Sequence, residues 1–195
     1  MNVPHIARIG AGILLSIVLA AGAVDAQDRV KMNLASSYPS TLGVVGENIQ
    51  RLIENITILS DGNFQIRFFE PNALVPALEV FDSVALGAVD MSYTTTGFHA
   101  GKFPGLVFFS SVPFGPSVSE YLGWIHFGGG KQIYDREYNK LGVQGFQCGV
   151  VVAESSGWFR EEVVSLEQLK GLKMRFFGLG ARVMERFGVS TQLLA

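Results

Sequence analysis

Apolar residues follow two different periods along the first part of the chain. Residues 30–34 (VKMNL) and 64–68 (FQIRF) alternate between apolar and polar, which predicts two β-strands. Between them, apolar residues recur every three or four positions, which predicts a helix that ends at Asp61-Gly62. A second helix from Pro76 to Gly87 and a third strand over residues 89–94 follow. The order strand, helix, strand, helix, strand predicts an α/β fold with a mostly parallel sheet and covering helices.

The second part of the chain begins with a stretch rich in Gly, Pro and Phe, residues 98–116, which predicts a long packed loop. The sequence Ser165-Leu166-Glu167-Gln168 is typical of a capping box at the start of a short helix. The other predicted elements are, in order, helices over 119–127 and 131–141, an extended apolar segment over 143–152, a strand over 172–177, a helix over 181–187 and the start of a strand after Gly188. These elements continue the α/β pattern.

The first 26 residues have the order of a secretory signal peptide. Arg8 precedes a continuous apolar run, and small residues stand three positions and one position before Gln27. The alternative is a membrane anchor, but the apolar run is shorter than the roughly 20 residues that a spanning helix needs. We therefore predict export to the periplasm with cleavage before Gln27.

Composition narrows the class of protein. The chain has 195 residues, of which 48% are hydrophobic and 16% charged, so it is long and apolar enough for one large domain or two small lobes. The net charge is -2 and basic runs are absent, which argues against a nucleic-acid partner. Cys148 is the only cysteine, so a disulfide within the chain is excluded.

Arg175 is the candidate for a ligand clamp. It lies in an apolar run near the carboxyl end of a predicted strand, just before Gly178-Leu179-Gly180 and a helix. Ligands of open α/β sheets bind at such an edge, and a guanidinium grips a carboxylate through two parallel hydrogen bonds. The alternative is an internal ion pair with a glutamate.

Other residues are weaker candidates, each with a structural alternative. Glu154 follows an apolar run and would face Arg175 or hold a hard cation, unless it forms a salt bridge at the rim. Trp158 is a pocket wall or a core residue, and Thr94 orients a polar ligand or belongs to a turn. His99 is a candidate acid or base, although a hydrogen-bonded structural histidine is the commoner case.

Several short stretches of the chain together resemble one family. They are Tyr38-Pro39-Ser40-Thr41-Leu42, Gly101-Lys102 with Pro104, Val112-Pro113-Phe114-Gly115, Gly128-Gly129-Gly130, Gly157-Trp158-Phe159 and Leu169-Lys170-Gly171-Leu172-Lys173-Met174-Arg175. In this order and combination the chain resembles the DctP-type solute-binding proteins of TRAP transporters. It is most similar to the TakP-like branch, which binds α-keto and other small carboxylic acids.

This resemblance implies a periplasmic-binding-protein-like (type II) fold with two lobes that close on a ligand. Lobe 1 would be residues 27–149, and residues 150–195 would start lobe 2. It implies that Arg175 binds the ligand carboxylate, with Tyr38 and Phe98 in the pocket. A sodium or calcium ion would lie beside the ligand at Glu154, and no organic cofactor is expected. The implied partners are the membrane permease of a sodium-driven transporter and, through a long C-terminal helix of the full-length protein, a second copy of the chain.

The chain also departs from the family pattern. Glu154 stands where the branch has glutamine, which would favour a divalent cation. Gly97, Phe98 and His99 stand where the branch has several tyrosines, so the pocket wall differs. Family members continue well past Ala195, so we expect a fragment with an incomplete second lobe. The competing hypotheses are an exported hydrolase that uses His99 and Glu154, an ABC-type binding protein, and an adaptor whose pocket is closed by packing.

Overall fold

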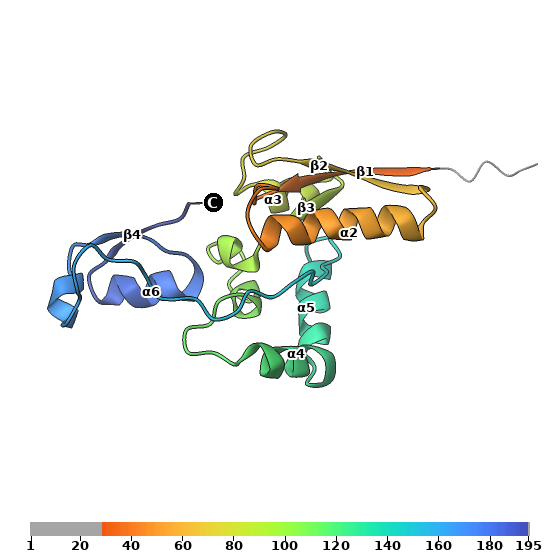
Figure 1. The fold of residues 1–195 in the computed structure, drawn as a ribbon. Coiled ribbons are helices and arrows are strands. Elements are labelled where there is room, and N and C mark those ends of the chain that lie inside the picture. The colour runs from red at the N-terminus through yellow and green to blue at the C-terminus, as the bar shows by residue number, and fades with distance from the viewer. Residues whose placement is uncertain (1–28, 195) are drawn as a thin grey trace, which may run out of the picture.

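The structure, a computed structural model, describes residues 29–194, and the predicted signal peptide lies outside the described residues. Its N-terminal part is a parallel three-stranded sheet in the order β2-β1-β3 (Figure 1). The strands are β1 (Val30–Ser36), β2 (Phe64–Phe69) and β3 (Met91–Tyr93). β1 and β2 agree with the strands predicted from alternation, and β1 continues two residues further than its apolar pattern. β3 lies within the third strand predicted over residues 89–94 and is shorter than it.

Helices cover both faces of this sheet. Helix α2 (Val45–Leu59) packs on the face that carries Leu34, and α3 (Val80–Ala85) packs on the face that carries Ala35. Neighbouring residues of a strand point to opposite faces, so β1 supplies the buried Leu34 to one layer and the buried Ala35 to the other. Burial of a large aliphatic side chain contributes roughly 1.5–3 kcal/mol, and these two layers hold the sheet in place.

A third cluster joins the segments that follow β3. It includes Phe81, Leu106, Phe109, Ile125, Tyr134 and Tyr138. The members come from α3, the 3₁₀ helix η4 (Leu106–Phe109) and the helices α4 (Val118–Phe127) and α5 (Gly130–Asn139). The 3₁₀ helix η3 (Thr96–His99) packs against η4. The prediction of an element-free loop over residues 98–116 is therefore wrong, because buried apolar residues order two short helical turns within it.

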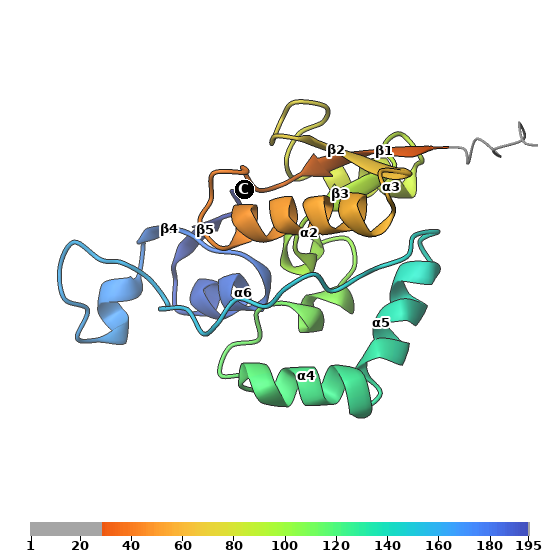
Figure 2. The ribbon, with the colours of Figure 1, turned by 45° about the vertical axis from the view of Figure 1, so that its right-hand side comes forward.

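The C-terminal part is a smaller β-α-β unit. Its parallel strands β4 (Lys173–Arg175) and β5 (Ser190–Gln192) flank helix α6 (Gly178–Arg186), and the 3₁₀ helix η5 (Leu166–Leu169) precedes them (Figure 2). Both halves of the predicted capping box are formed at η5. Helix α6 begins three residues earlier than predicted, so Gly178-Leu179-Gly180 forms its first turn instead of a preceding loop.

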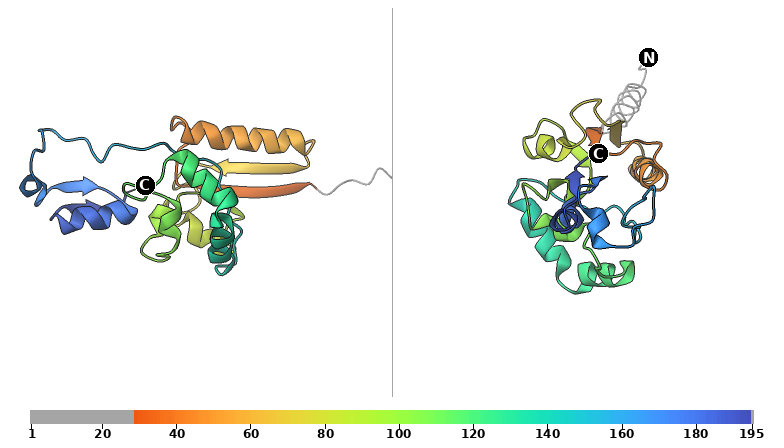
Figure 3. Two further views of the ribbon diagram at one scale, coloured as in Figure 1. Left: turned by 90° about the horizontal axis from the view of Figure 1, so that it is seen from below. Right: turned by 90° about the vertical axis from the view of Figure 1, so that its left-hand side faces the viewer.

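A long segment joins the two parts. Residues 143–154 run without regular structure from α5 to the C-terminal unit (Figure 3). This segment is extended, as its composition predicts, but it pairs with no strand among residues 29–194. Its apolar side chains are open to solvent; Phe146 is 75% exposed and Val152 is 71% exposed. The boundary between lobes at residues 149 and 150 stays a prediction.

Candidate functional site

The carboxyl ends of β1 and β3 lie side by side and fix a group of hydroxyls. The Ser37 hydroxyl donates to the Ala77 carbonyl oxygen at 2.6 Å and lies 2.8 Å from Oγ1 of Thr94. The Ser36 hydroxyl donates to the Tyr38 carbonyl oxygen at 2.7 Å. Both serines are buried, so these bonds hold Thr94 and the start of the Tyr38 loop in fixed positions.

An aromatic row leads from this edge to the C-terminal unit. It consists of Tyr93, Tyr38, Phe98 and Phe177, which contact one another in this order. The ring centroids of Tyr38 and Phe98 are 5.9 Å apart, and those of Phe98 and Phe177 are 5.3 Å apart. Tyr38 and Phe98, both expected in the pocket, are thus in contact with each other, and Phe177 extends the row.

Tyr38 lies within the electrostatic field of both charged candidates. Burial raises the pKa of Tyr38 to about 12, and a hydrogen bond with Thr95 opposes this shift. Smaller effects on the same pKa come from neighbouring Tyr93, from Arg175, which lowers it, and from Glu154, which raises it. The Tyr38 hydroxyl therefore keeps its proton at neutral pH.

Arg175 is exposed at the end of β4, and its guanidinium is occupied by a backbone group. Its Nε and Nη2 atoms donate to the Leu194 carbonyl oxygen at 3.2 Å and 3.0 Å. The guanidinium carbon lies 5.0 Å from the centre of the Phe177 ring. Within residues 29–194 it forms no ion pair. The alternative of an internal ion pair with a glutamate is therefore not formed among these residues, and the Arg175 side chain is open to water.

Glu154 and Trp158 lie on the exposed joining segment. No salt bridge of Glu154 is present among the described residues, so the predicted rim ion pair is not formed there. The Trp158 side chain is 95% exposed, so it forms neither core nor wall in this structure, and its role in ligand binding stays a prediction.

A cation at Glu154 would need further ligands. No group of three or more His, Cys, Asp or Glu side chains gathers anywhere in the described part of the chain. A carboxylate oxygen suits sodium or calcium chemically, but calcium takes about 6–8 oxygen ligands. Glu154 therefore fits as one ligand of such an ion, with the remaining oxygens from backbone carbonyls, water or a bound carboxylate.

His99 is a core residue and not an accessible base. Its side chain is 3% exposed, stacks on Phe81 with ring centroids 4.7 Å apart, and leaves Nε2 without a hydrogen-bond partner. Burial lowers the pKa of His99 to about 4; Asp82 opposes this shift and Lys102 adds to it. A buried neutral imidazole cannot reach a substrate, which removes the base from the hydrolase hypothesis.

Three residues of the site escaped the sequence analysis as ligand candidates. Tyr93 and Phe177 belong to the aromatic row, and the Ser110 hydroxyl lies 3.0 Å from Oγ1 of Thr95. Strand alternation does place Phe177 on the face of Arg175, which is a usable signal. Ser110 follows the unpredicted turn η4, and nothing in its local pattern indicates the contact.

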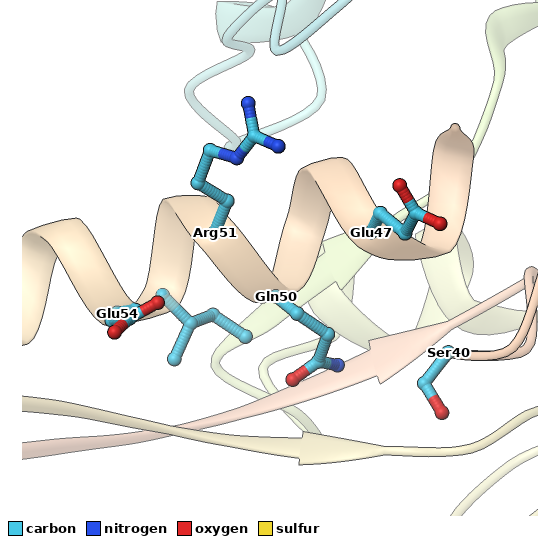
Figure 4. A pocket seen from close by; sticks show the side chains of 6 residues that line it. Ser40, Glu47, Gln50, Arg51 and Glu54 are labelled. Atoms are coloured by element: carbon cyan, nitrogen blue, oxygen red, sulfur yellow. The ribbon is translucent and has the colours of Figure 1, made fainter. Parts of the chain in front are cut away.

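An open hollow lies on α2, away from the aromatic row, Arg175 and Glu154. It has a volume of about 560 Å³ beside α2 and is lined by Ser40, Glu47, Gln50, Arg51, Ile53 and Glu54 (Figure 4). Figure 4 shows Arg51 and Gln50 pointing to opposite sides of the helix. None of the aromatic row, Arg175 or Glu154 lines it, so this open hollow gives no support to the predicted ligand site.

Comparisons with known proteins agree with the resemblance. A family model, DctP, described as bacterial extracellular solute-binding protein, family 7, matches residues 30–195. A relative from Nostoc sp., a monocarboxylate 2-oxoacid-binding periplasmic protein, is 37% identical over 168 residues, which are 85% of this chain and 45% of the relative. The chain thus spans about half the length of the relatives that it matches.

Solved TRAP solute-binding proteins have the same fold. One from Bordetella bronchiseptica, with calcium and picolinate in its active site, has a TM-score of 0.82 and 32% identity over 85% of this chain and 49% of its own. One from Pseudoalteromonas atlantica, with sodium and pyruvate, has a TM-score of 0.77 and 29% identity over 85% of this chain and 50% of its own. These comparisons confirm the predicted fold class. Within the described residues, no helix has the length and hydrophobicity that crossing a membrane requires.

Proposed function

The chain belongs to the DctP family of bacterial extracellular solute-binding proteins, and we propose that it is the receptor of a TRAP transporter for a small monocarboxylate. The preferred ligand class is a short 2-oxo acid, as in the name of the Nostoc relative and the pyruvate of the Pseudoalteromonas neighbour. The family and these relatives bind solutes and are not enzymes, which agrees with the buried His99.

One observation carries the proposal: the two donors that Arg175 directs at a single oxygen. Nε and Nη2 both reach the Leu194 carbonyl, which is the fork that a carboxylate accepts through its two oxygens. A ligand carboxylate is charged and would form stronger bonds than this neutral carbonyl. Tyr38, which keeps its proton, would donate a hydrogen bond to the ligand, and the Phe98 and Phe177 rings would pack on its carbon skeleton.

Glu154 would help to hold a cation beside the ligand. The neighbours contain sodium in one case and calcium in another. A carboxylate carries a full negative charge, so Glu154 favours calcium over sodium in this protein. The cation would supply positive charge next to the carboxylate and the 2-oxo group of the ligand.

The location and the partners complete the proposal. The signal-peptide pattern of residues 1–26 supports export, and the Nostoc relative is periplasmic, so we place this protein in the periplasm. The receptor would deliver its ligand to the membrane permease subunits of the transporter. A homodimer of the full-length protein remains part of the proposal through the family resemblance alone.

A thermal-shift screen tests this function. Bound ions are removed from the complete mature protein, and calcium or sodium is added back. The melting temperature is then measured with increasing concentrations of pyruvate or of its neutral amide. A receptor gains stability in proportion to the logarithm of ligand concentration, so pyruvate should raise the melting temperature and the amide should not. An adaptor whose pocket is closed by packing would show no shift with any carboxylate of a wider panel, and that result would overturn the proposal.

A further inference from the structure

The N-terminal part and the C-terminal unit meet where helix α6 begins. Phe177 is the N-cap residue of α6, and α6 packs against η3, which contains Gly97. A Cβ atom added at Gly178 would lie 3.4 Å from Cγ2 of Val107 and 3.9 Å from the Cα atom of Gly97. The two backbones therefore approach each other closely at Gly97.

Gly97 has no space for any side chain. A Cβ atom at this position would lie 2.5 Å from Cε2 of Phe177 and 2.9 Å from Oγ of Ser110. Carbon atoms in contact are ordinarily about 3.5–4.0 Å apart, so the Phe177 ring occupies the volume that an alanine methyl would need. The φ angle of Gly97 is not in the left-handed region, so its backbone would accept alanine and the conflict is one of packing alone.

The Phe177 ring in turn contacts Arg175, the proposed carboxylate clamp. It stands edge-on to Phe98 with ring centroids 5.3 Å apart and lies 5.0 Å from the guanidinium carbon of Arg175. If an added methyl group displaced the Phe177 ring, the cation–π contact with Arg175 would be displaced as well. The same methyl would press on Ser110, whose hydroxyl contacts Thr95.

We propose that Gly97 is a positioning residue of the ligand site: the space left by its missing side chain seats Phe177, and the seated ring fixes the Arg175 guanidinium that lies beside it. This inference rests on the proposed carboxylate binding, and it adds a residue that touches no ligand. It also accounts for glycine at the point where η3 meets α6, since a side chain there would displace the Phe177 ring.

The test is a set of substitutions in the complete protein with pyruvate as the probe, measured by isothermal titration. Gly97→Ala should weaken pyruvate binding by about tenfold or more, the usual order for overpacking a tight contact. Gly105→Ala is the matched control and should bind as the wild type does. Gly105 has φ of -68°, and a methyl group added there would have no neighbouring atom within 4 Å.

A second background shows whether the effect passes through the ring. In Phe177→Ala, the added Gly97→Ala should cost much less pyruvate affinity than in the wild type, because the ring contacts are gone and only the Ser110 hydroxyl remains close to the added methyl group. An equal loss in both backgrounds, or a Gly97→Ala protein that binds like Gly105→Ala, would overturn the proposal.

The melting temperature without ligand gives an independent reading of the same contact. Gly97→Ala should lower it clearly more in the wild-type background than in Phe177→Ala, where only the Ser110 contact remains. This measurement stands even if the wild type binds no pyruvate, a result that would count against the proposed function and not against the contact. Equal lowering in the two backgrounds would count against the contact.

Discussion

Arg175 and Leu194 are joined by a forked hydrogen bond: Nε and Nη2 of the arginine reach the Leu194 carbonyl oxygen at 3.2 Å and 3.0 Å. This bond ties the end of β4 to the residues just after β5. The guanidinium is thus held in a defined orientation by a neutral acceptor, with the Phe177 ring beside it. A ligand carboxylate would compete with a single carbonyl, which is a weaker partner than an internal carboxylate.

Glu154→Gln should change which cation supports binding. Loss of the negative charge weakens the hold on a divalent ion more than the hold on a monovalent one, because the attraction scales with ionic charge. We expect the ratio of pyruvate affinity in calcium to that in sodium to fall by about tenfold. Titrations of ion-stripped protein in each salt measure this ratio.

Glu161→Gln is the matched control for this substitution, since Glu161 is another exposed acid of the same region. It should keep the wild-type ratio. If Glu154→Gln also keeps it, Glu154 is not a ligand of the ion.

His99 should make the protein less stable in mild acid. Burial lowers the pKa of His99 to about 4, whereas an unfolded histidine has a pKa of about 6.5. Between these values the unfolded state binds a proton that the folded state refuses, so the free energy of unfolding falls as pH drops. The contribution of the neutral His99 to the free energy of unfolding is complete above pH ~6.5. The loss of unfolding free energy by pH ~4 is on the order of 3 kcal/mol.

Urea denaturation at a series of pH values measures this effect. His99→Leu should flatten the profile between pH ~6.5 and ~4, with little loss at neutral pH because Nε2 has no partner to lose. Replacement of the exposed His126 by glutamine should leave the profile as it is. A profile that His99→Leu does not change would show that another group causes the acid sensitivity.

Ser117→Ala should remove the cap of helix α4. The Ser117 hydroxyl accepts from the Glu120 amide, and the Glu120 carboxylate accepts from the Ser117 amide at 2.8 Å. Loss of such a cap costs about 1 kcal/mol of unfolding free energy. Ser119→Ala, in the first turn of the same helix, should be neutral or slightly stabilising because alanine favours a helix. Equal urea midpoints for the two variants would contradict the capping role.

The parallel sheet was predictable because its signals are local. Alternation in residues 30–34 and 64–68 marks β1 and β2, and Ser165 with Gln168 marks the cap of η5. The turns η3 and η4 were not predictable in this way, since Phe98, Leu106 and Phe109 are ordered by packing against distant segments and not by a local period.

The candidate site was predicted only in part. Tyr38 and Phe98 come from separate segments, and the structure brings their rings into one row with Phe177, which lies beside Arg175. The partner of Arg175 escaped prediction because a carbonyl acceptor has no sequence signal. Ser110 and the close approach at Gly97 depend on how α6 meets η3, which no single segment encodes.

The most direct measurement is isothermal titration of pyruvate into the complete protein and its Arg175→Ala and Arg175→Lys variants. A charged bond at a desolvated site is worth about 2–5 kcal/mol, so Arg175→Ala should lose at least about thirtyfold in affinity. Arg175→Lys should recover only part of it, because lysine lacks the fork. Wild-type affinity in Arg175→Ala would contradict the assignment of Arg175 as the carboxylate clamp.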